Sequence, residues 1–557
     1  MTPTDEQQNI IDIFQNSGNV KINALAGTGK TTTLRLLTEK YQNIRFLYLA
    51  FNKGIVEQSK SLFSSNIKIV TIHSMAYRYV CRDIDLSKLV NGYKAIELKD
   101  LLDIKDYRYA GIIQKIFSAY CNFPLKEINK ETVEKIIKYD GDVRAMMFLY
   151  NKGVKTNYED IESKLKKFWN MLEKEEIRPT HDFYIKYFQI NFKKYADYIR
   201  KSYDCVLLDE AQDSNPLFID ILFNLDIKQI YVGDRHQNIY GFRKTMNAME
   251  FLEGENFYLT QNFRSSQQIL DKANNVLGIL KGEHKKLTSF TDVKETNDSA
   301  IITRTNAGIV QMIIKNSDKF TIKTIRNPDE IFATVLTLLK KYTKTDIPIQ
   351  GYSYIDKFNS FSDIEDYAEK TMDAELLTGI TTVKDYKDKI KYAYKYAHDC
   401  IDKIQTGKPL IYLTSAHTSK GLEWDNVIVH DDFGVFTDMI ESIALEMRGI
   451  KNYNDLLFHI NANPQYGAVY NFIQEVNLFY VAITRAKKKL TITGKINELY
   501  AEGKVTEEFI NNIIKNASFH DNKHGRKPDQ IGTNTLSISD KTSFQSVKEI
   551  SDNQTEY

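Results

Sequence analysis

The residues nearest the amino terminus that could do chemistry form a glycine-containing loop. Segment 24–32 reads Ala-Leu-Ala-Gly-Thr-Gly-Lys-Thr-Thr, follows an apolar run and opens a stretch with helical apolar spacing. In such a loop the backbone N–H groups and the positive end of the helix hold a phosphate. Lys30 would reach the β- and γ-phosphates of a nucleotide, and the Thr31 hydroxyl would bind Mg²⁺. The predicted nucleotide-binding residues of this loop are Ala24, Leu25, Ala26, Gly27, Thr28, Gly29, Lys30, Thr31 and Thr32.

A phosphate loop also needs a second Mg²⁺ anchor on a neighbouring strand, and two adjacent carboxylates supply it. The apolar run 205–208 predicts a buried strand, and Asp209 and Glu210 follow it directly. Asp209 would hold the metal through water, and Glu210 would orient and deprotonate an attacking water. Taken separately, each motif has a plain alternative, because position 24 is Ala where the strict loop pattern has Gly, and many strands end in a carboxylate. Together they predict a nucleoside triphosphate site.

A parallel sheet is needed to bring these residues together, and the sequence predicts two. Strand-like apolar runs separated by helical stretches lie at 20–25, 44–51, 67–72, 205–208, 229–232 and 256–259. A second set lies at 300–305, 411–413, 427–430 and 490–493. Strands that alternate with helices indicate a parallel sheet. The expected fold class is therefore α/β, with two sheet domains that are each interrupted by a mostly helical insert.

Changes in composition set the expected domain boundaries. Stretches rich in Lys and Glu with apolar residues at a period of about 3.6 predict the helical inserts. We expect a first α/β domain at 1–86 and 201–280, a helical insert at 87–200, a second α/β domain at 281–329 and 406–500, and a short helical insert at 330–405. Residues 517–557 are rich in Ser, Asn, Asp and Lys with few apolar side chains, which predicts a disordered polar tail.

Composition excludes several classes of protein. The 557 residues suffice for several domains, and the net charge of +2 creates no global field for nucleic acid, so any such contact must be local. No apolar run reaches the length of about 18 residues that membrane insertion requires. The four cysteines are scattered, so neither a disulfide scaffold nor a zinc ribbon is expected. The first ten residues lack the regions of a secretory signal, so we expect a cytoplasmic protein, nucleoid-associated in a bacterium.

Further motifs stand in a fixed order around the loop and the carboxylates. They are Pro3–Gln7, Ala50–Lys53, Thr71–Ser74, Asp209–Asp213, Val232–Arg243, Gln261–Ser265, His417–Trp424 and Tyr480–Ala486. In this order the chain resembles the superfamily 1 helicases of the UvrD/Rep type, from about residue 3 to residue 495. The resemblance implies two RecA-like P-loop domains, each with a mostly helical insert, and ATP with Mg²⁺ as cofactors.

The same resemblance implies roles for further residues at an ATP site between the two α/β domains. Gln7 would read adenine, Phe263 would stack on it, and Glu423 would bind the ribose; the alternative for Phe263 is a core aromatic. The catalytic residues that the resemblance implies are Glu210, Gln237, Arg264 and Arg485. In these roles the glutamine would sense the γ-phosphate, and the two arginines would reach it from the second domain and stabilise transition-state charge.

Single-stranded DNA would cross both domains. Stacking of bases on aromatic side chains tolerates any sequence, because every base has a π-face. The predicted DNA-binding residues, which depend mainly on the motif resemblance, are Phe51, His73, Tyr240 and Phe242. Phe51, Tyr240 and Phe242 would stack on bases. His73 would lie near the DNA backbone. The alternative for any single aromatic is a place in the core.

Several details are similar to the F-box DNA helicases. These are Tyr48–Lys53, Thr71–Ala76, Lys420–Asp425 and Phe358–Phe361 upstream of Asp366–Ala368. Because the motif Pro3–Gln7, which carries the glutamine that would read adenine, begins at residue 3, we expect the resemblance to cover the motor region and no F-box to be present. The insert at 330–405 is shorter than in the UvrD/Rep proteins, so the regulation that depends on their insert is not carried over.

Three functions remain open from the sequence. The first is an ATP-dependent helicase that moves 3′→5′ on single-stranded DNA and unwinds tailed duplex DNA. The second is a translocase that strips recombinase filaments and unwinds weakly. The third is a hydrolysis-poor DNA-binding scaffold, or the motor subunit of a nuclease or defence complex; no nuclease-like carboxylate cluster follows residue 495, so cutting would need a partner. DNA is the expected partner in all three, with a recombinase or a nuclease added in the last two.

Overall fold

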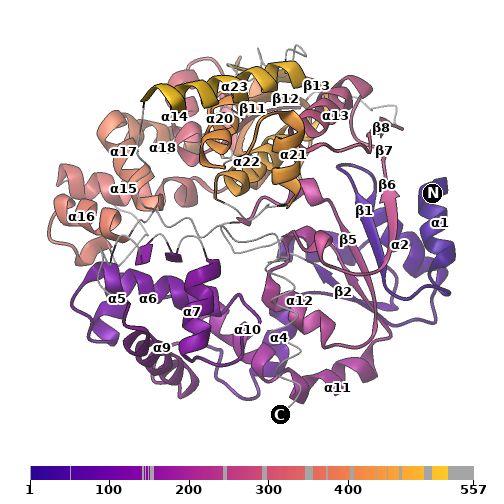
Figure 1. Cartoon of the computed structure of the whole chain (residues 1–557), viewed down its shortest axis with the longest axis horizontal. Coiled ribbons are helices and arrows are strands. Elements are labelled where there is room, and N and C mark those ends of the chain that lie inside the picture. The colour runs from indigo at the N-terminus through magenta and orange to yellow at the C-terminus, as the bar shows by residue number, and fades with distance from the viewer. Residues whose placement is uncertain are drawn as a thin grey trace.

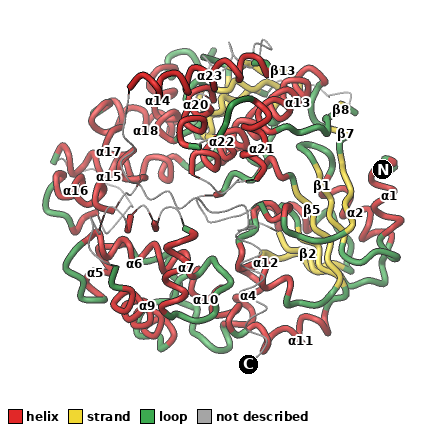
Figure 2. The backbone as a smooth tube through the Cα atoms, in the orientation of Figure 1, coloured by secondary structure: helices red, strands yellow, loops and turns green. Residues whose placement is uncertain are grey.

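The computed structural model describes most of the chain. The described residues are 2–50, 52–140, 143–144, 146–147, 150, 156–241, 247–290, 298–344, 355–371, 374–401, 407–433, 436–447, 449–462, 467–494 and 505–524. The predicted DNA-binding residues Phe51 and Phe242 lie outside them, as does segment 525–557. The described part contains two large parallel sheets with helices packed on them, a small two-stranded sheet and two helical inserts (Figure 1), and Figure 2 shows most strands gathered in two places. The predicted α/β fold class is confirmed.

Six of the described strands form the first sheet, in the order β3-β2-β4-β5-β1-β6, and all pair in parallel. They are β1 (Val20–Ala24), β2 (Phe46–Ala50), β3 (Ile67–Thr71), β4 (Cys205–Leu208), β5 (Lys228–Gly233) and β6 (Glu255–Leu259). Strands covered on both faces read as continuous apolar runs. In β2, Phe46 and Tyr48 face one core while Leu47 and Leu49 face the other.

Helices cover both faces of the first sheet. On the face of Phe46 lie α1 (Asp5–Ile13), α2 (Lys30–Lys40) and α3 (Lys53–Lys60). On the opposite face lie α4 (Ile72–Val80) and α12 (Pro216–Phe223). The phosphate loop follows β1 and Asp209 follows β4, so both motifs lie at the carboxyl edge of one parallel sheet. Ligands of open α/β sheets bind at this edge.

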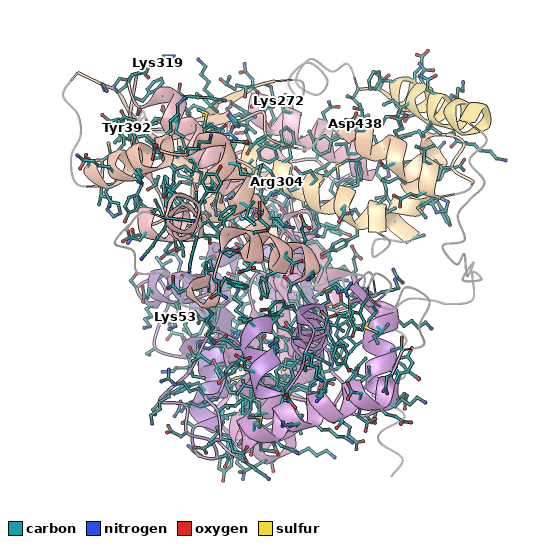
Figure 3. All side chains as sticks on the ribbon, turned by 90° about the vertical axis from the view of Figure 1, so that its left-hand side faces the viewer. Lys53, Lys272, Arg304, Lys319, Tyr392 and Asp438 are labelled. Atoms are coloured by element: carbon teal, nitrogen blue, oxygen red, sulfur yellow. The ribbon has the colours of Figure 1, made fainter. Side chains whose placement is uncertain are left out.

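Five of the described strands form the second sheet, in the order β10-β11-β9-β12-β13, again all parallel. They are β9 (Ser299–Thr303), β10 (Thr321–Thr324), β11 (Leu410–Ser415), β12 (Trp424–Val429) and β13 (Ala486–Ile492). The helices associated with it are α13 (Gln267–Lys281), α14 (Asn306–Asn316), α19 (Ala416–Ser419), α20 (Phe436–Glu446), α21 (Tyr453–Ala462), α22 (Gly467–Ile483) and α23 (Glu507–His524). Arg304, labelled in Figure 3, follows β9 and ties it to α22 through Glu475, with Nε 2.9 Å from Oε2.

The remaining helices form two inserts. The first insert contains α5 (Ala95–Leu101), α6 (Tyr107–Tyr120), α7 (Lys130–Tyr139), α9 (Tyr158–Glu173), α10 (His181–Ile190) and α11 (Phe192–Ser202), and the second contains α15 (Pro328–Thr343), α16 (Phe361–Thr371), α17 (Ala374–Tyr386) and α18 (Lys389–Asp399). Helix α6 packs on α16, side by side in Figure 1. The rings of Tyr107 and Tyr367 meet there with centroids 5.6 Å apart. The two inserts therefore contact each other directly.

Two predicted boundaries differ from the structure. Helix α13 packs on α22 and β13, and its apolar face belongs to the core of the second sheet, so the boundary at residue 280 is too late. A two-stranded sheet of β7 (Gln261–Asn262) and β8 (Thr288–Ser289) flanks this helix. Helix α23 continues to His524, past the predicted start of the tail at 517, because residues such as Ala517 are buried in its contact with the second sheet's helices.

Candidate functional site

The phosphate loop has a shape that only glycine permits at two positions. Gly27 and Gly29 have φ of +70° and +78°, in the left-handed region that favours glycine. A Cβ on Gly27 would also lie 2.5 Å from the side-chain nitrogen of Asn262. Within the described residues no side chain caps the amino terminus of α2, which leaves its first N–H groups for a ligand. The loop therefore has a shape that could accept a phosphate, and the nucleotide-binding role of Lys30 and its neighbours stays a prediction.

Two lysines from different parts of the chain hold Glu210. Lys30 Nζ lies 3.6 Å from Oε1 of Glu210, and Lys420 Nζ lies 3.3 Å from Oε2. Burial would raise the pKa of Glu210, but the two ammonium groups hold it well below its usual range. Glu210 also has φ of +53°, a left-handed conformation that is unusual for a residue with a side chain. The structure thus keeps an ionised carboxylate beside the phosphate loop, where a water-activating base is needed.

Asp209 is the fully buried member of the carboxylate pair. The Tyr48 hydroxyl donates a hydrogen bond to its Oδ2. Burial raises the pKa of Asp209 to about 6, and the adjacent Glu210 carboxylate adds to the shift. A cation would lower the cost of burying the ionised Asp209 carboxylate. Mg²⁺ prefers oxygen ligands, and it usually binds through one or two carboxylates together with waters and substrate phosphates. Because no group of three or more His, Cys, Asp or Glu side chains in the described part of the chain could hold a metal, Mg²⁺ here would depend on Asp209, Thr31 and the nucleotide.

Lys420 is a central residue that the sequence-based site omitted. It follows α19 of the second sheet and forms a buried ion pair with Asp213, in the 3₁₀ turn after Glu210. Its ammonium also donates to the backbone oxygen of Gln237 at 2.9 Å and lies 5.3 Å from the ring centroid of Tyr240. Burial would lower the pKa of Lys420, but the carboxylates of Asp213 and Glu210 raise it. Motif order alone could not reveal a contact between segments so distant in the chain.

A second set of contacts ties Gln237 to the phosphate loop. Gln237 Nε2 donates to Asp234 Oδ2 at 2.8 Å. The hydroxyl of Tyr480, on α22, donates to the same oxygen at 3.3 Å and accepts from the backbone N–H of Ala26 at 3.1 Å. The sequence-based site omitted Tyr480 although it opens a predicted motif. A side chain of the second sheet's helix thus joins the phosphate loop to the segment that carries Gln237.

The two predicted arginine fingers lie next to each other. Arg264 Nε donates to Glu423 Oε2 at 2.6 Å. The residue predicted to bind the ribose is therefore paired with one of the predicted arginine fingers. Arg485 is 2% exposed and donates through Nε to the backbone oxygen of Val481 at 2.9 Å. Burial, together with the charge of Arg264, lowers the pKa of Arg485 to about 9. In this structure both arginines bond to protein groups, and a γ-phosphate would have to draw them away.

A polar and an aromatic side chain meet beside Gly29. Gln7 Nε2 donates to Thr33 Oγ1 at 3.1 Å, and its Oε1 accepts from the backbone N–H of Thr4 at 3.1 Å. An amide carries two N–H donors and two acceptor lone pairs, so one donor and one acceptor remain, the pair that adenine N7 and N6 require. The Phe263 ring, 39% exposed, lies 3.5 Å from where a Cβ on Gly29 would be. This corner has room and polar groups for an adenine base, and the adenine-binding roles of both residues stay predictions.

The two described DNA-binding candidates lie in different surroundings. Tyr240 is half-buried, and its hydroxyl donates to the backbone oxygen of His417 at 3.5 Å. His73 is exposed at the start of α4, where its ring approaches Tyr184 of α10 and Phe218 of α12, with centroids 6.2 and 5.7 Å away. Tyr240 therefore borders the cluster around Lys420, while His73 lies where the first insert meets the first sheet.

Fold and site together define a P-loop protein of two α/β domains whose side chains meet beside the loop. Comparison with known families adds the particular class. The family model of the UvrD/REP helicase N-terminal domain matches residues 4–256, and that of the UvrD-like helicase C-terminal domain matches residues 353–497. The chain belongs to the UvrD/Rep helicase family, and its two α/β domains are the RecA-like domains of that family.

Individual relatives include the F-box helicases. F-box DNA helicase 1 of Gallus gallus is 27% identical over 540 residues, which cover 89% of this chain and 50% of that protein. F-box DNA helicase protein 1 of Schizosaccharomyces pombe is 27% identical over 549 residues, covering 89% of this chain and 58% of that protein. ATP-dependent DNA helicase PcrA of Staphylococcus epidermidis is 25% identical over 289 residues, 47% of this chain and 38% of that protein. The chain spans half to three-fifths of the F-box relatives' length.

No helix in the described part of the chain is both long enough and apolar enough to cross a membrane.

Proposed function

We propose that the protein is an ATP-driven motor that moves 3′→5′ on single-stranded DNA and unwinds tailed duplex DNA. The observation that carries the proposal is the position of Lys420. This lysine of the second sheet pairs with Glu210 and Asp213 of the first, so a change of charge at the hydrolytic carboxylate acts directly on the opposite domain. Such a contact couples hydrolysis to movement of one domain against the other.

In this proposal each polar group at the site has one task in hydrolysis. Lys30 leaves Glu210 to neutralise the β- and γ-phosphates, and Glu210 then orients the attacking water and accepts its proton. Thr31 and Asp209 would hold Mg²⁺, which would supply positive charge to the phosphate oxygens. Arg264 and Arg485 supply positive charge to the transition state, which requires them to exchange their present protein partners for the γ-phosphate.

The binding groups follow the same division. Gln7 and Phe263 hold the adenine, and Glu423 takes the ribose once Arg264 has turned to the phosphate. Gln237 senses the γ-phosphate and lies in the same segment as Tyr240. The DNA bases stack on Tyr240, Phe51 and Phe242, and His73 contacts the DNA strand at the start of α4. We further propose that 87–200 and 330–405 are inserts in two motor domains.

A second candidate is removal of recombinase filaments from DNA with weak unwinding. The similarity to F-box DNA helicases favours it. An inert scaffold agrees less well with a site in which Lys30, Glu210, Gln237 and the two arginines are all present.

Strand displacement on 3′-tailed and 5′-tailed duplexes tests the proposal. The protein should unwind only the 3′-tailed duplex, and its ATPase should rise with single-stranded DNA. Lys30→Ala should abolish hydrolysis and leave DNA binding intact. Glu210→Gln should bind Mg·ATP but hydrolyse it at least about a hundredfold more slowly than wild type. A preference for the 5′ tail, or no DNA stimulation, would contradict the proposal; clearance of a recombinase filament without unwinding would support the second candidate.

A further inference from the structure

Two phenylalanines lie side by side beside the phosphate loop, and only Phe263 was predicted to act there. The second is Phe290, directly after β8. Its ring centroid is 5.5 Å from that of Phe263, and the planes are 77° apart, an edge-to-face arrangement that aromatic pairs prefer. Phe290 is 60% exposed and Phe263 39% exposed. Neither ring is a core aromatic, so the pair does not owe its position to burial.

Hydrogen bonds of the backbone hold Phe290 in this place. Its N–H donates to the backbone oxygen of Asn262 at 2.8 Å, which extends the pairing of β7 with β8. The Asn262 side chain in turn donates to the backbone oxygen of Ala26 in the phosphate loop at 2.6 Å. Ser289 Oγ donates to the backbone oxygen of Ser265 at 2.9 Å. A continuous set of hydrogen bonds therefore fixes the backbone that carries the ring relative to the phosphate loop.

The neighbourhood of the pair indicates what the rings are for. The Phe263 ring borders Gly29, and the Gln7 amide lies within 3.1 Å of the same point, so the aromatic pair flanks the corner that can accept adenine. Apolar side chains left exposed in contact with each other commonly mark a binding site. An edge-on neighbour restricts the rotation of an aromatic ring and so fixes the plane on which a base can stack.

We propose that Phe290 is a positioning residue for the nucleotide base. It holds the Phe263 ring in the orientation that stacks on adenine and thereby sets the affinity for the base, not the rate of hydrolysis. The inference depends on the proposed function, because it requires ATP to bind with its base at Phe263.

The experiment compares Phe290→Ala with Phe458→Ala, a matched control on α21 whose side chain is 67% exposed. Loss of an edge-to-face contact should raise KM for ATP about two- to tenfold in Phe290→Ala, with kcat unchanged and the melting temperature lowered by no more than a few degrees. Binding of inorganic tripolyphosphate, which has no base, should be unaffected. Phe290→Tyr, which keeps an aromatic ring, should have the wild-type KM for ATP. Phe290→Leu should have the raised KM of the alanine variant. Phe458→Ala should match wild type throughout.

Three results would overturn the inference and leave the proposed function standing. They are an unchanged KM in Phe290→Ala, an equal loss of affinity for tripolyphosphate, and full rescue by leucine. A wild-type protein that binds neither ATP nor tripolyphosphate would overturn the proposed function and the inference together.

Discussion

At the scale of single residues, Lys420 shows how charge is arranged around the site. Its side chain is almost fully buried, and a buried ammonium is tolerated only when carboxylates and hydrogen-bond acceptors surround it. Asp213, Glu210 and the backbone oxygen of Gln237 supply these partners. The sequence predicted residues for a nucleotide site because motifs record residue type and spacing. It could not indicate Lys420 or Tyr480, whose partners come from segments far along the chain.

Removing the Lys420 ammonium should destabilise the protein as well as slow it. Lys420→Met leaves Asp213 buried without its cation, which typically costs about 3–5 kcal/mol of unfolding free energy, whereas Glu210 keeps Lys30 as a partner. Adding Asp213→Asn should recover part of that loss, because the stranded charge disappears. Urea unfolding of both single variants and the double variant measures the coupling. Lys489→Met, on the exposed side of β13, is the control and should change little.

At the scale of elements, the segment after β5 is held mostly by the second sheet's helices. Glu283, after α13, accepts from Arg235 Nε at 3.1 Å and lies 2.8 Å from His236 Nε2, while Asn477 of α22 donates to the backbone oxygen of Asn238 at 2.8 Å. The segment that carries Gln237 thus extends from one sheet and packs on the other. The sequence-based boundary at 280 placed the neighbouring helix α13 in the first domain, because a hydrophobic pattern defines an apolar face and not the sheet on which that face packs.

Asn238 joins the two domains within this segment. Its Nδ2 donates to the backbone oxygen of Gln212 at 2.5 Å, and its Oδ1 accepts from Gln474 Nε2 at 3.1 Å. Asn238→Ala should therefore reduce the stimulation of the ATPase by DNA severalfold while basal hydrolysis persists. We expect a loss of about 1–3 kcal/mol in stability from the unpaired groups. ATPase titrations with single-stranded DNA measure the effect, with the exposed Asn224→Ala as control. Full DNA stimulation in Asn238→Ala would show that this link carries no coupling.

At the scale of the whole molecule, the two inserts meet on the side opposite the amino terminus (Figure 1). Gly111 of α6 lies at that contact, and a Cβ there would be 3.4 Å from both Met146 Cε and Thr371 Cγ2. Each insert was predicted to be helical from its own periodicity. Their contact was not predicted, because it joins segments about 250 positions apart in the sequence.

A large side chain at Gly111 should separate the inserts. Alanine fits within ordinary contact distance and favours a helix, so Gly111→Ala should fold and act as wild type. Gly111→Trp has no room between α6 and α16, and relief of that clash should expand the molecule in solution scattering and expose the inserts to protease. ATP binding should survive, since the phosphate loop lies on the first sheet. An unchanged scattering profile in the tryptophan variant would mean that the contact is absent in solution.

Near the carboxyl end, the folded helix α23 is followed by residues 525–557, which belong to the stretch that composition predicts to be a polar tail. Helix α23 buries Ile510, Ile514 and Ala517 against the helices of the second sheet. Cutting the chain after His524 should leave the melting temperature and the DNA-stimulated ATPase unchanged, because polar residues contribute no core. Cutting after Thr506 removes α23, and at about 1.5–3 kcal/mol for each buried isoleucine it should cost roughly 3–6 kcal/mol. Thermal melts and ATPase assays of the two truncated proteins decide this. Loss of activity in the protein cut after His524 would assign a function to residues 525–557.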